Sequence, residues 1–370
     1  MSTPKHTILV LMAIAFGPTM CYNTLKITNY WALMKYLLID TSNMFFRARH
    51  QAHRAADSWT KLGFALYLTL MSANKVVRRF QADHVVFCLE GRSWRKDHYR
   101  PYKANRAVAR AAMNDEQAEE DKLFWETYDE LTKYLSNKTN CSVIREPQAE
   151  ADDIIARWIA LHPQDEHIVV SSDTDFVQLV APNVKQYNGI TDELITVDGI
   201  FDVKGQLIKD KKTKLPKTVP DPAWLLFEKC MRGDTSDNVF SAYPGVRTKG
   251  TKNKTGLEEA FGDMGKKGYA WNNLMLQRWT DHNGDEHRVL DDYERNRTLI
   301  DLTAQPQEIK DLVDAAIRAQ VSHKDVGQVG SHFLRFCGKY ELVKCSDSAD
   351  SFGRWLNETY KGVLNEQHNS

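Results

Sequence analysis

The sequence predicts an α/β fold with a mostly parallel central sheet flanked by helices. Three apolar runs, at 36–39, 85–89 and 168–170, are too short for helices and have the composition of buried strands. Amphipathic patterns of helical period lie between them, at 59–80 and 149–161. Strands that alternate with helices in this way predict a parallel sheet, because each parallel pair of strands needs a crossover connection.

Each of the three predicted strands is followed by acidic side chains. Asp40 ends the first strand, Glu90 follows the second, and the third leads into Asp173 and Asp175. The carboxyl ends of parallel strands meet at one edge of a sheet, where loops and helix N-termini converge on ligands. We therefore expect an acidic site at this edge.

Composition excludes several classes of protein. Of 370 residues, 42% are hydrophobic and 26% charged, which rules out a disordered chain, a collagen-like fibre and a polytopic membrane protein. The 49 basic and 49 acidic residues cancel, but they are unevenly distributed. Residues 92–110 hold seven bases and one acid, whereas residues 150–175 hold seven acids and one base. The net charge of zero therefore hides two opposed local fields.

Residues 1–33 are interpreted as an N-terminal extension. Their apolar run at 8–16 has the length of a signal-peptide core and is too short to span a bilayer, while Met34 directly precedes the first strand. A mis-assigned start, a native extension and a signal peptide remain open. The six cysteines form no CxxC pair, which indicates neither a zinc site nor a disulfide framework and favours a reducing, cytoplasmic setting.

Acids at strand ends and helix starts form a candidate metal site. Glu150 and Asp153 are three residues apart and share one face of the helix that follows Pro147. Each acid alone is an ordinary surface residue or helix cap, but crowded carboxylates repel unless cations neutralise them, and oxygen ligands select Mg²⁺ or Mn²⁺. The set is Asp40, Glu90, Glu150, Asp152, Asp153, Asp173, Asp175, Asp234 and Asp237.

Five motifs occur in the order typical of one family, at 38–43, 101–106, 150–153, 172–176 and 233–238. Over residues 35–260 the chain resembles the bacteriophage branch of 5′ nucleases in the flap endonuclease family, which includes phage ribonuclease H and 5′-3′ exonucleases. The resemblance implies a divalent-metal-dependent, structure-selective 5′ nuclease that hydrolyses phosphodiesters in DNA replication or repair. Its substrates would be DNA with 5′ ends or flaps, with RNA–DNA hybrids and RNA-primer removal also within the family's range.

The resemblance also implies two Mg²⁺ or Mn²⁺ ions and a role for each acid. The first ion would be held by Asp40, Glu90, Glu150 and Asp152. The second would be held by Asp175 and Asp237, with Asp173 close to both ions and with Asp153 and Asp234 as outer-shell or shared ligands. The family usually has Asp where this chain has Glu90, which supplies its carboxylate from one methylene further.

The basic stretch at 92–110 supplies the candidate residues for phosphate chemistry and for DNA binding. By resemblance, Lys103 and Arg106 contact the scissile phosphate and stabilise the transition state. Cations interleaved with aromatic side chains suit single-stranded or frayed ends, because bases stack on rings while cations follow phosphates. The expected DNA-binding residues are Arg92, Arg95, Lys96, Arg100, Tyr102 and Arg110. The acidic stretch at 115–135 fits the helical arch of the family.

A second expected DNA contact is the segment 243–250, which resembles the helix-three-turn-helix region of the family. Its backbone amides would hold duplex DNA through Gly245, Val246, Arg247 and Lys249. A K⁺ site is left open, because Gly-Val-Arg replaces the usual tighter turn and residues 251–254 add length. We predict a nuclease core with a basic arch at 34–220 and a helical C-terminal region at 221–370.

Two other functions remain as alternatives. A PIN-type ribonuclease shares acidic strand ends but needs neither the motif at 233–238 nor a long basic arch. A non-catalytic DNA-binding replication accessory would not need so complete a set of acids. For the nuclease we expect a monomer in the cytoplasm, of the host cell if phage-encoded, without membrane contact. Its expected protein partners are a single-stranded DNA-binding protein or the replisome.

Overall fold

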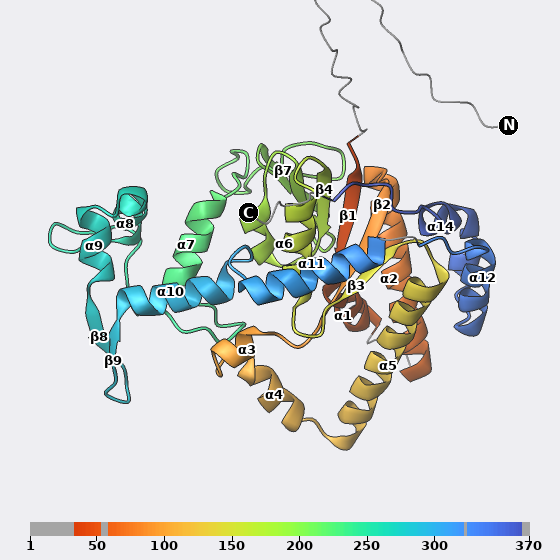
Figure 1. Ribbon diagram of the computed structural model, residues 1–370, viewed down its shortest axis with the longest axis horizontal. Helices are drawn as coiled ribbons and strands as arrows, with labels where there is room; N and C mark the ends of the chain where they lie inside the picture. Colours follow the sequence, from red (N-terminus) through yellow and green to blue (C-terminus); the bar gives the residue numbers. More distant parts are fainter. Residues whose placement is uncertain (1–32, 53–57, 322–323, 365–370) are drawn as a thin grey trace, which may run out of the picture. The chain divides into compact units, whose positions relative to one another are not determined.

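The computed structural model describes residues 33–52, 58–321 and 324–364 (Figure 1). The N-terminal extension predicted for residues 1–33 lies outside these ranges, apart from Leu33. From Leu33 onward the described chain forms one compact unit.

The predicted α/β fold with a mostly parallel sheet is confirmed. A seven-stranded sheet has the order β3-β2-β1-β4-β5-β6-β7, in which the first five strands are parallel and the last two pair antiparallel. The three predicted strands are present as β1 (Lys35–Asp40), β2 (His84–Leu89) and β4 (Glu166–Val170). The structure adds β3 (Ser142–Arg145), β5 (Val184–Asn188), β6 (Glu193–Thr196) and β7 (Gly199–Phe201).

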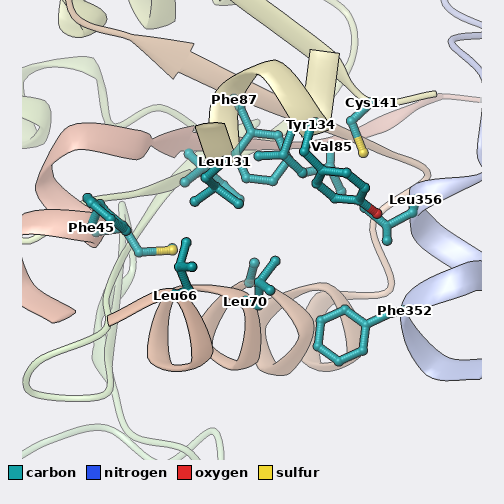
Figure 2. Packing of buried hydrophobic residues seen from close by; sticks show 14 of the residues in the cluster. Phe45, Leu66, Leu70, Val85, Phe87, Leu131, Tyr134, Cys141, Phe352 and Leu356 are labelled. Atoms are coloured by element: carbon teal, nitrogen blue, oxygen red, sulfur yellow. The ribbon is translucent and has the colours of Figure 1, made fainter. Parts of the chain in front are cut away.

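Helices cover both faces of the parallel strands, so alternate residues of each strand are buried in different cores. On one face, Leu37 and Phe87 pack against α1 (Thr41–Ala52), α2 (Ser58–Phe80) and α5 (Asp115–Lys138). Figure 2 shows this cluster, in which Leu66 and Leu70 come from α2. On the other face, Tyr36 and Leu38 pack against α6 (Ala151–Leu161) and α11 (Gln307–Val321).

Two helices form the arms of the predicted arch. α4 (Ala104–Ala111) has no buried residue, whereas α5 is anchored in the core from Phe124 onward by side chains that include Leu131. The Asn114 side chain accepts from the backbone N–H of Gln117 and so starts α5 immediately after the link from α4. Figure 1 shows the two arms meeting at this link, with α3 (Arg95–His98) at the base of α4.

A third core lies in the region after residue 220. It contains Phe227, Met231, Leu257, Trp271 and Tyr293. Its elements are α7 (Pro222–Arg232), α8 (Leu257–Asp263), η2 (Met264–Lys266), α9 (Tyr269–Met275), β8 (Arg278–Thr280), β9 (Glu286–Arg288) and α10 (Val289–Ile300). The predicted boundary near residue 220 falls just before α7 and remains a prediction.

The last helices return to the sheet. α11 packs on α6, while α12 (Val329–Lys339), α13 (Val343–Ser346) and α14 (Ala349–Leu356) pack on the opposite face around Phe333 and Phe352. The helical region expected at 221–370 is therefore divided between its own core and both faces of the sheet.

Two further features concern the chemistry of the described chain. Its five cysteines are buried and free of disulfides. Within the described ranges, no helix combines the length and the apolar character that a membrane span requires.

Candidate active site

Asp40 occupies the carboxyl end of β1, at the centre of the sheet. Its carboxylate accepts from the backbone N–H of Asn43 at 3.1 Å and from Ser171 Oγ at 3.0 Å. Burial nevertheless raises the pKa of Asp40 to about 6. A carboxylate held at this place without a cation is therefore costly to ionise.

Glu90 follows the neighbouring strand β2. Its Oε2 atom accepts from the backbone N–H of Ala151 at 3.1 Å, at the start of α6. Burial, together with the charge of Glu150, raises the pKa of Glu90 to about 7. The longer side chain thus reaches the same helix N-terminus at which Glu150 lies.

Glu150 caps the N-terminus of α6 and is the most fully compensated of the acids. Its carboxylate accepts from Tyr102 OH at 2.8 Å and from Arg95 Nη1 at 3.1 Å, and it also contacts Lys103 Nζ. Although burial opposes the charge, Lys103 and Arg95 lower the pKa of Glu150 to about 2. Glu150 is therefore ionised at neutral pH before any metal binds.

The next two acids on α6 have different surroundings. Asp152 is half-buried, and burial raises its pKa well above the usual range. Asp153 is fully buried and accepts from Arg95 and from Trp94 Nε1. Both oxygens of Asp153 are engaged by interior donors, and its expected role as an outer-shell or shared ligand remains a prediction.

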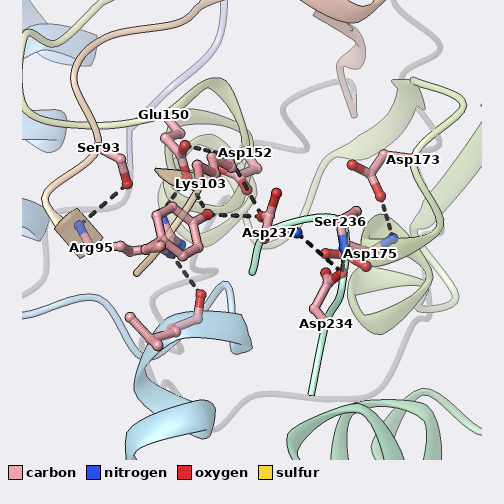
Figure 3. A network of polar contacts seen from close by, with 12 residues as sticks. Ser93, Arg95, Lys103, Glu150, Asp152, Asp173, Asp175, Asp234, Ser236 and Asp237 are labelled. Carbon is pink, nitrogen blue, oxygen red and sulfur yellow. Dashed lines mark hydrogen bonds and ion pairs between the residues drawn. The ribbon is translucent and has the colours of Figure 1, made fainter. Parts of the chain in front are cut away.

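The second group of acids surrounds a lysine. Lys229 Nζ, on the last turn of α7, contacts Asp175 and lies 2.7 Å from Asp234 Oδ2. Figure 3 shows these two carboxyl groups together with Asp173. Burial raises the pKa of Asp175 to about 6 even beside this cation. Asp173 is exposed, and its Oδ1 accepts from the Asp175 backbone N–H at the start of η1 (Thr174–Leu179).

Asp237 joins the second group to the first. Its carboxylate accepts from Tyr102 OH at 3.0 Å and lies 3.1 Å from Arg106 Nη2 and 3.6 Å from Lys103 Nζ. Asp234 holds the same loop by accepting from the Ser236 N–H and hydroxyl. The motif at 233–238 is therefore placed against the base of the arch.

The two candidate catalytic cations differ in exposure. Lys103 is one-tenth exposed and precedes α4 with a left-handed φ of 53°, and its backbone N–H donates to the Asp237 carbonyl oxygen at 2.8 Å. Burial opposes the charge of Lys103, but Glu150 and Asp237 outweigh it and raise its pKa. The Arg106 side chain is 54% exposed. Lys103 thus belongs to the acid cluster, whereas Arg106 borders it.

The donor set fits a divalent ion. In the part of the chain that the structure describes, no three acid, histidine or cysteine side chains converge in ligand geometry, because Lys103 and Lys229 lie among the carboxylates. The donors are nevertheless all carboxylate oxygens, and Asp40, Glu90 and Asp175 have raised pKa values. Buried oxygens that resist ionisation are the environment that Mg²⁺ or Mn²⁺ would neutralise.

The expected DNA-binding residues of the basic stretch divide into two sets. Arg92, Lys96, Arg100 and Arg110 are exposed. The expectation that Arg95 and Tyr102 contact DNA is corrected, because these residues are 1% and 3% exposed and bind acids of the cluster. A run of bases does not reveal which member points inward, and the buried acids that select Arg95 lie more than fifty residues away.

The segment 243–250, which is expected to contact duplex DNA, lies in the loop between α7 and α8. Gly245 has a φ of 74°, and Arg247 and Lys249 are exposed. Val246 is corrected, because it is buried and its N–H donates to the Tyr243 carbonyl oxygen. Glu259 holds the additional residues 251–254 of this loop in place, because its carboxylate accepts from the backbone N–H groups of Gly250 and Gly256 on either side of them.

Lys229 is a site residue that the sequence analysis missed. The sequence contains a signal for Lys229, because this residue lies on the last turn of α7, four residues before the Gly233 that begins an acidic motif. Ser171, which orients Asp40, was also missed. A serine at a strand end carries no distinguishing signal, whereas a lysine that ends a helix beside two acids does.

The chain is similar in sequence to known proteins. Residues 35–205 match the 5′-3′ exonuclease N-terminal resolvase-like domain. The DNA polymerase I of Rhizobium leguminosarum is 31% identical over 239 residues, and the flap endonuclease Xni of Shewanella piezotolerans is 26% identical over 170 residues. These alignments cover 61% and 45% of this chain, and 21% and 60% of the relatives. The chain therefore spans about a fifth of the polymerase and three-fifths of the flap endonuclease.

Solved structures share the fold. A bacteriophage T5 flap endonuclease in complex with DNA and metal ions is 18% identical, with a TM-score of 0.51. A T5 5′-exonuclease with bound zinc is also 18% identical, with a TM-score of 0.52. Each covers 77% of this chain and 98% of the other. At this identity the likeness concerns the fold, including the sheet edge on which the acids lie.

Proposed function

We propose that the chain belongs to the family of 5′-3′ exonucleases and flap endonucleases and is a divalent-metal-dependent, structure-selective 5′ nuclease. The observation that carries the proposal is the joining of the acid cluster to the basic arch. Tyr102 and Lys103 at the base of α4 bind both Glu150 and Asp237, which come from opposite sides of the cluster. DNA that binds along the exposed arginine and lysine side chains of the arch would therefore reach the acid cluster where α4 begins.

Two Mg²⁺ or Mn²⁺ ions would supply an activated water and neutralise charge on the attacking and leaving oxygens. Asp40, Glu90, Glu150 and Asp152 would hold one ion, and Asp173, Asp175 and Asp237 the other, with Asp234 orienting the loop. Lys103 is aimed at the cluster from the arch and would bind a phosphate oxygen, exchanging its carboxylate contacts for the developing charge. Arg106 would hold the neighbouring phosphate from the exposed side.

The exposed cations would bind the substrate on both sides of the scissile phosphate. Arg92, Lys96, Arg100 and Arg110 belong to the arch, and Arg247 and Lys249 belong to the loop before α8. Contacts of this kind are sequence-independent, which suits recognition of a 5′ end or flap by shape. RNA–DNA hybrids are proposed as further substrates, because the same contacts reach phosphates of either strand.

Finer assignments concern the branch of the family, the oligomeric state, the cellular setting and the protein partners. Placement in the bacteriophage branch is supported by the likeness to the T5 flap endonuclease, whereas the sequence relatives are bacterial. A monomer in the cytoplasm, working with a single-stranded DNA-binding protein or the replisome, is proposed from the family's place in replication. A PIN-type ribonuclease remains the less favoured reading, because the motif at 233–238 is bonded into the acid cluster here.

The test is product analysis on 5′-labelled flap, nicked and RNA–DNA hybrid duplexes with Mg²⁺. We expect cleavage at the flap junction or stepwise from the 5′ end, no cleavage in EDTA, and none by an Asp173→Asn variant. Cleavage of single-stranded RNA alone would instead favour the PIN-type alternative. A protein that binds these DNA duplexes and cuts none of them would favour the non-catalytic accessory.

A further inference from the structure

Arg95 makes an unusually complete set of bonds for a residue in a stretch of surface bases. Its side chain is 1% exposed. Nη1 donates to Asp153 Oδ2 at 2.9 Å and Nη2 donates to Asp153 Oδ1 at 2.8 Å, forming a bidentate pair. Nη1 also donates to Glu150 Oε2 at 3.1 Å, and Nε donates to the Leu299 carbonyl oxygen at 2.7 Å. All three guanidinium nitrogens are therefore engaged by fixed acceptors.

The acceptors of Arg95 belong to two different helices. Glu150 and Asp153 start α6, where Asp153 Oδ2 also accepts from the Glu150 backbone N–H at 3.1 Å. Leu299 lies in the last turn of α10, whose terminal carbonyl groups lack partners within the helix and favour a cation. Arg95 itself starts α3 at the base of the arch. One side chain thus joins the arch, the acid-bearing helix and the region that contains the third core.

The bond to Glu150 determines which of its oxygens faces the acid cluster. Arg95 and Tyr102 donate to Oε2, and Lys103 contacts Oε1 (Figure 3). With Oε2 engaged from the interior, Oε1 is presented on the Lys103 side. A lysine at position 95 could supply the charge but not a planar fork that binds Asp153 with two nitrogens while a third reaches Leu299.

We infer that Arg95 is a positioning residue of the metal site, which orients Glu150 through the Arg95–Asp153 pair and ties α3, α6 and α10 into one frame. The inference rests on the proposed nuclease function for its catalytic consequence only. The inference also predicts a change in the metal affinity of the DNA-free protein, and this prediction does not depend on nuclease activity. Whether the affinity falls or rises in an Arg95 variant distinguishes a positioning role from a simple charge effect. Removing a cation near bound metal ions strengthens metal binding by charge alone, whereas loss of Glu150 orientation weakens it.

The test compares full-length wild-type protein with Arg95→Met and Arg95→Lys variants. Arg157→Met is the matched control, because Arg157 lies on α6, as Asp153 does, and makes a bidentate pair with Asp314 at 2.7 Å for both bonds, away from the acid cluster. Mn²⁺ binding by the DNA-free protein is measured by calorimetry, single-turnover cleavage of a flap duplex at saturating Mg²⁺, and DNA affinity in EDTA. Folding of each variant is checked by circular dichroism.

We expect Arg95→Met to bind Mn²⁺ about tenfold more weakly and to cleave about 100-fold more slowly, with DNA affinity within threefold. Arg95→Lys should shift both quantities in the same direction by less, and it carries the test if Arg95→Met does not fold. Arg157→Met should match the wild type in both. Unchanged or tighter Mn²⁺ binding by a folded Arg95 variant would overturn the inference, as would equal losses in Arg157→Met.

The same measurements separate this inference from the proposed function. A wild-type protein that binds Mn²⁺ but cleaves no flap, nicked or hybrid duplex would contradict the nuclease proposal, while the calorimetric comparison of the Arg95 variants would still decide the role of Arg95.

Discussion

The two ends of the parallel strands contain buried polar groups of opposite kinds. At the carboxyl end lie carboxyl groups with Lys103, Lys229 and Arg95 among them. At the amino end, Tyr36, His84 and His167 form one row across β1, β2 and β4, because Tyr36 is in register with both histidines. His162 and Tyr360 complete this second cluster, which we call the amino-edge cluster.

Burial disfavours the charged form of the histidines in the amino-edge cluster, and the bonds of His84 and His162 fit neutral rings. His162 Nδ1–H donates to the Trp158 carbonyl oxygen, while Nε2 accepts from Tyr360 OH at 2.7 Å. His84 Nδ1–H donates to the Glu358 carbonyl oxygen, while Nε2 accepts from Ser142 Oγ. Burial lowers the pKa of His84 and of His162 to about 4.

The two ends of this one sheet therefore bury polar groups by different means. The amino end uses groups that lose their charge easily, packed with aromatic rings. The carboxyl end places lysines and arginines among carboxyl groups, of which Glu150 stays ionised, and an ion pair of this kind costs desolvation energy that yields little stability. Retaining charge is useful only where a charged ligand binds, so the difference itself indicates which end is functional.

The largest effect should come from removing a charge at the carboxyl end. We expect Asp175→Asn to reduce single-turnover cleavage by about 1,000-fold, since about 4 kcal/mol of transition-state stabilisation corresponds to roughly three powers of ten. DNA affinity in EDTA should stay within several-fold, because Asp175 faces Lys229 and not the exposed cations. A variant with a rate within tenfold of the wild type would show that this acid lies outside the reaction.

A smaller loss is expected from the cation beside Glu150. Lys103→Met should slow cleavage by about 100-fold, because a cation directed at the transferring phosphate acts mainly in the transition state. The dependence of DNA affinity on salt should be unchanged, since Lys103 is buried against acids in the free protein. If only the affinity falls, with a shallower salt dependence, Lys103 is a phosphate contact without a catalytic role.

The amino end should affect stability and not catalysis. Burial lowers the pKa of His167 to about 3, so at pH 5 the unfolded chain binds a proton there that the folded chain does not. Stability is then full above about pH 6.5 and falls as the pH is lowered, by about 2 kcal/mol at pH 5 from His167 alone.

Urea unfolding of the wild type and of His167→Leu at pH 5, 6 and 7 tests this. As the pH is lowered, the free energy of unfolding of the variant should fall less than that of the wild type, because position 167 no longer titrates. Some fall should remain, because His84 and His162 still titrate beside Tyr36 and Asp165. Cleavage at pH 7.5 should not change. Parallel pH curves for the two proteins would contradict the assignment of His167.

The smallest effect should come from one exposed cation of the arch. Arg100→Ala should weaken DNA binding by about threefold and lower the slope of log affinity against log salt by about one. Single-turnover cleavage at saturating DNA should stay at the wild-type rate. An unchanged slope would place the DNA away from this part of the arch.

The sequence predicted the parts of this molecule that depend on local patterns. Three buried strands, the helices between them and the acids at the strand ends follow from periodicity and from the geometry of parallel sheets. Burial of Arg95 and Tyr102 could not be predicted, because it depends on Glu150, Asp153 and Asp237, which only the folded chain brings to the base of the arch. The antiparallel strands β6 and β7 were missed, because they have four and three residues, which is too short to show a period.

The return of the last helices to the sheet has a consequence for the order in which the protein is made. The acids are all translated by residue 237, yet the core around Phe45 and Leu66 is completed only by Phe333, Phe352 and Leu356. A nascent chain therefore carries all of the candidate metal ligands while one apolar face of its sheet is still partly uncovered. We expect a premature stop codon near residue 320 to yield a protein that contains all of these acids and aggregates through the uncovered face.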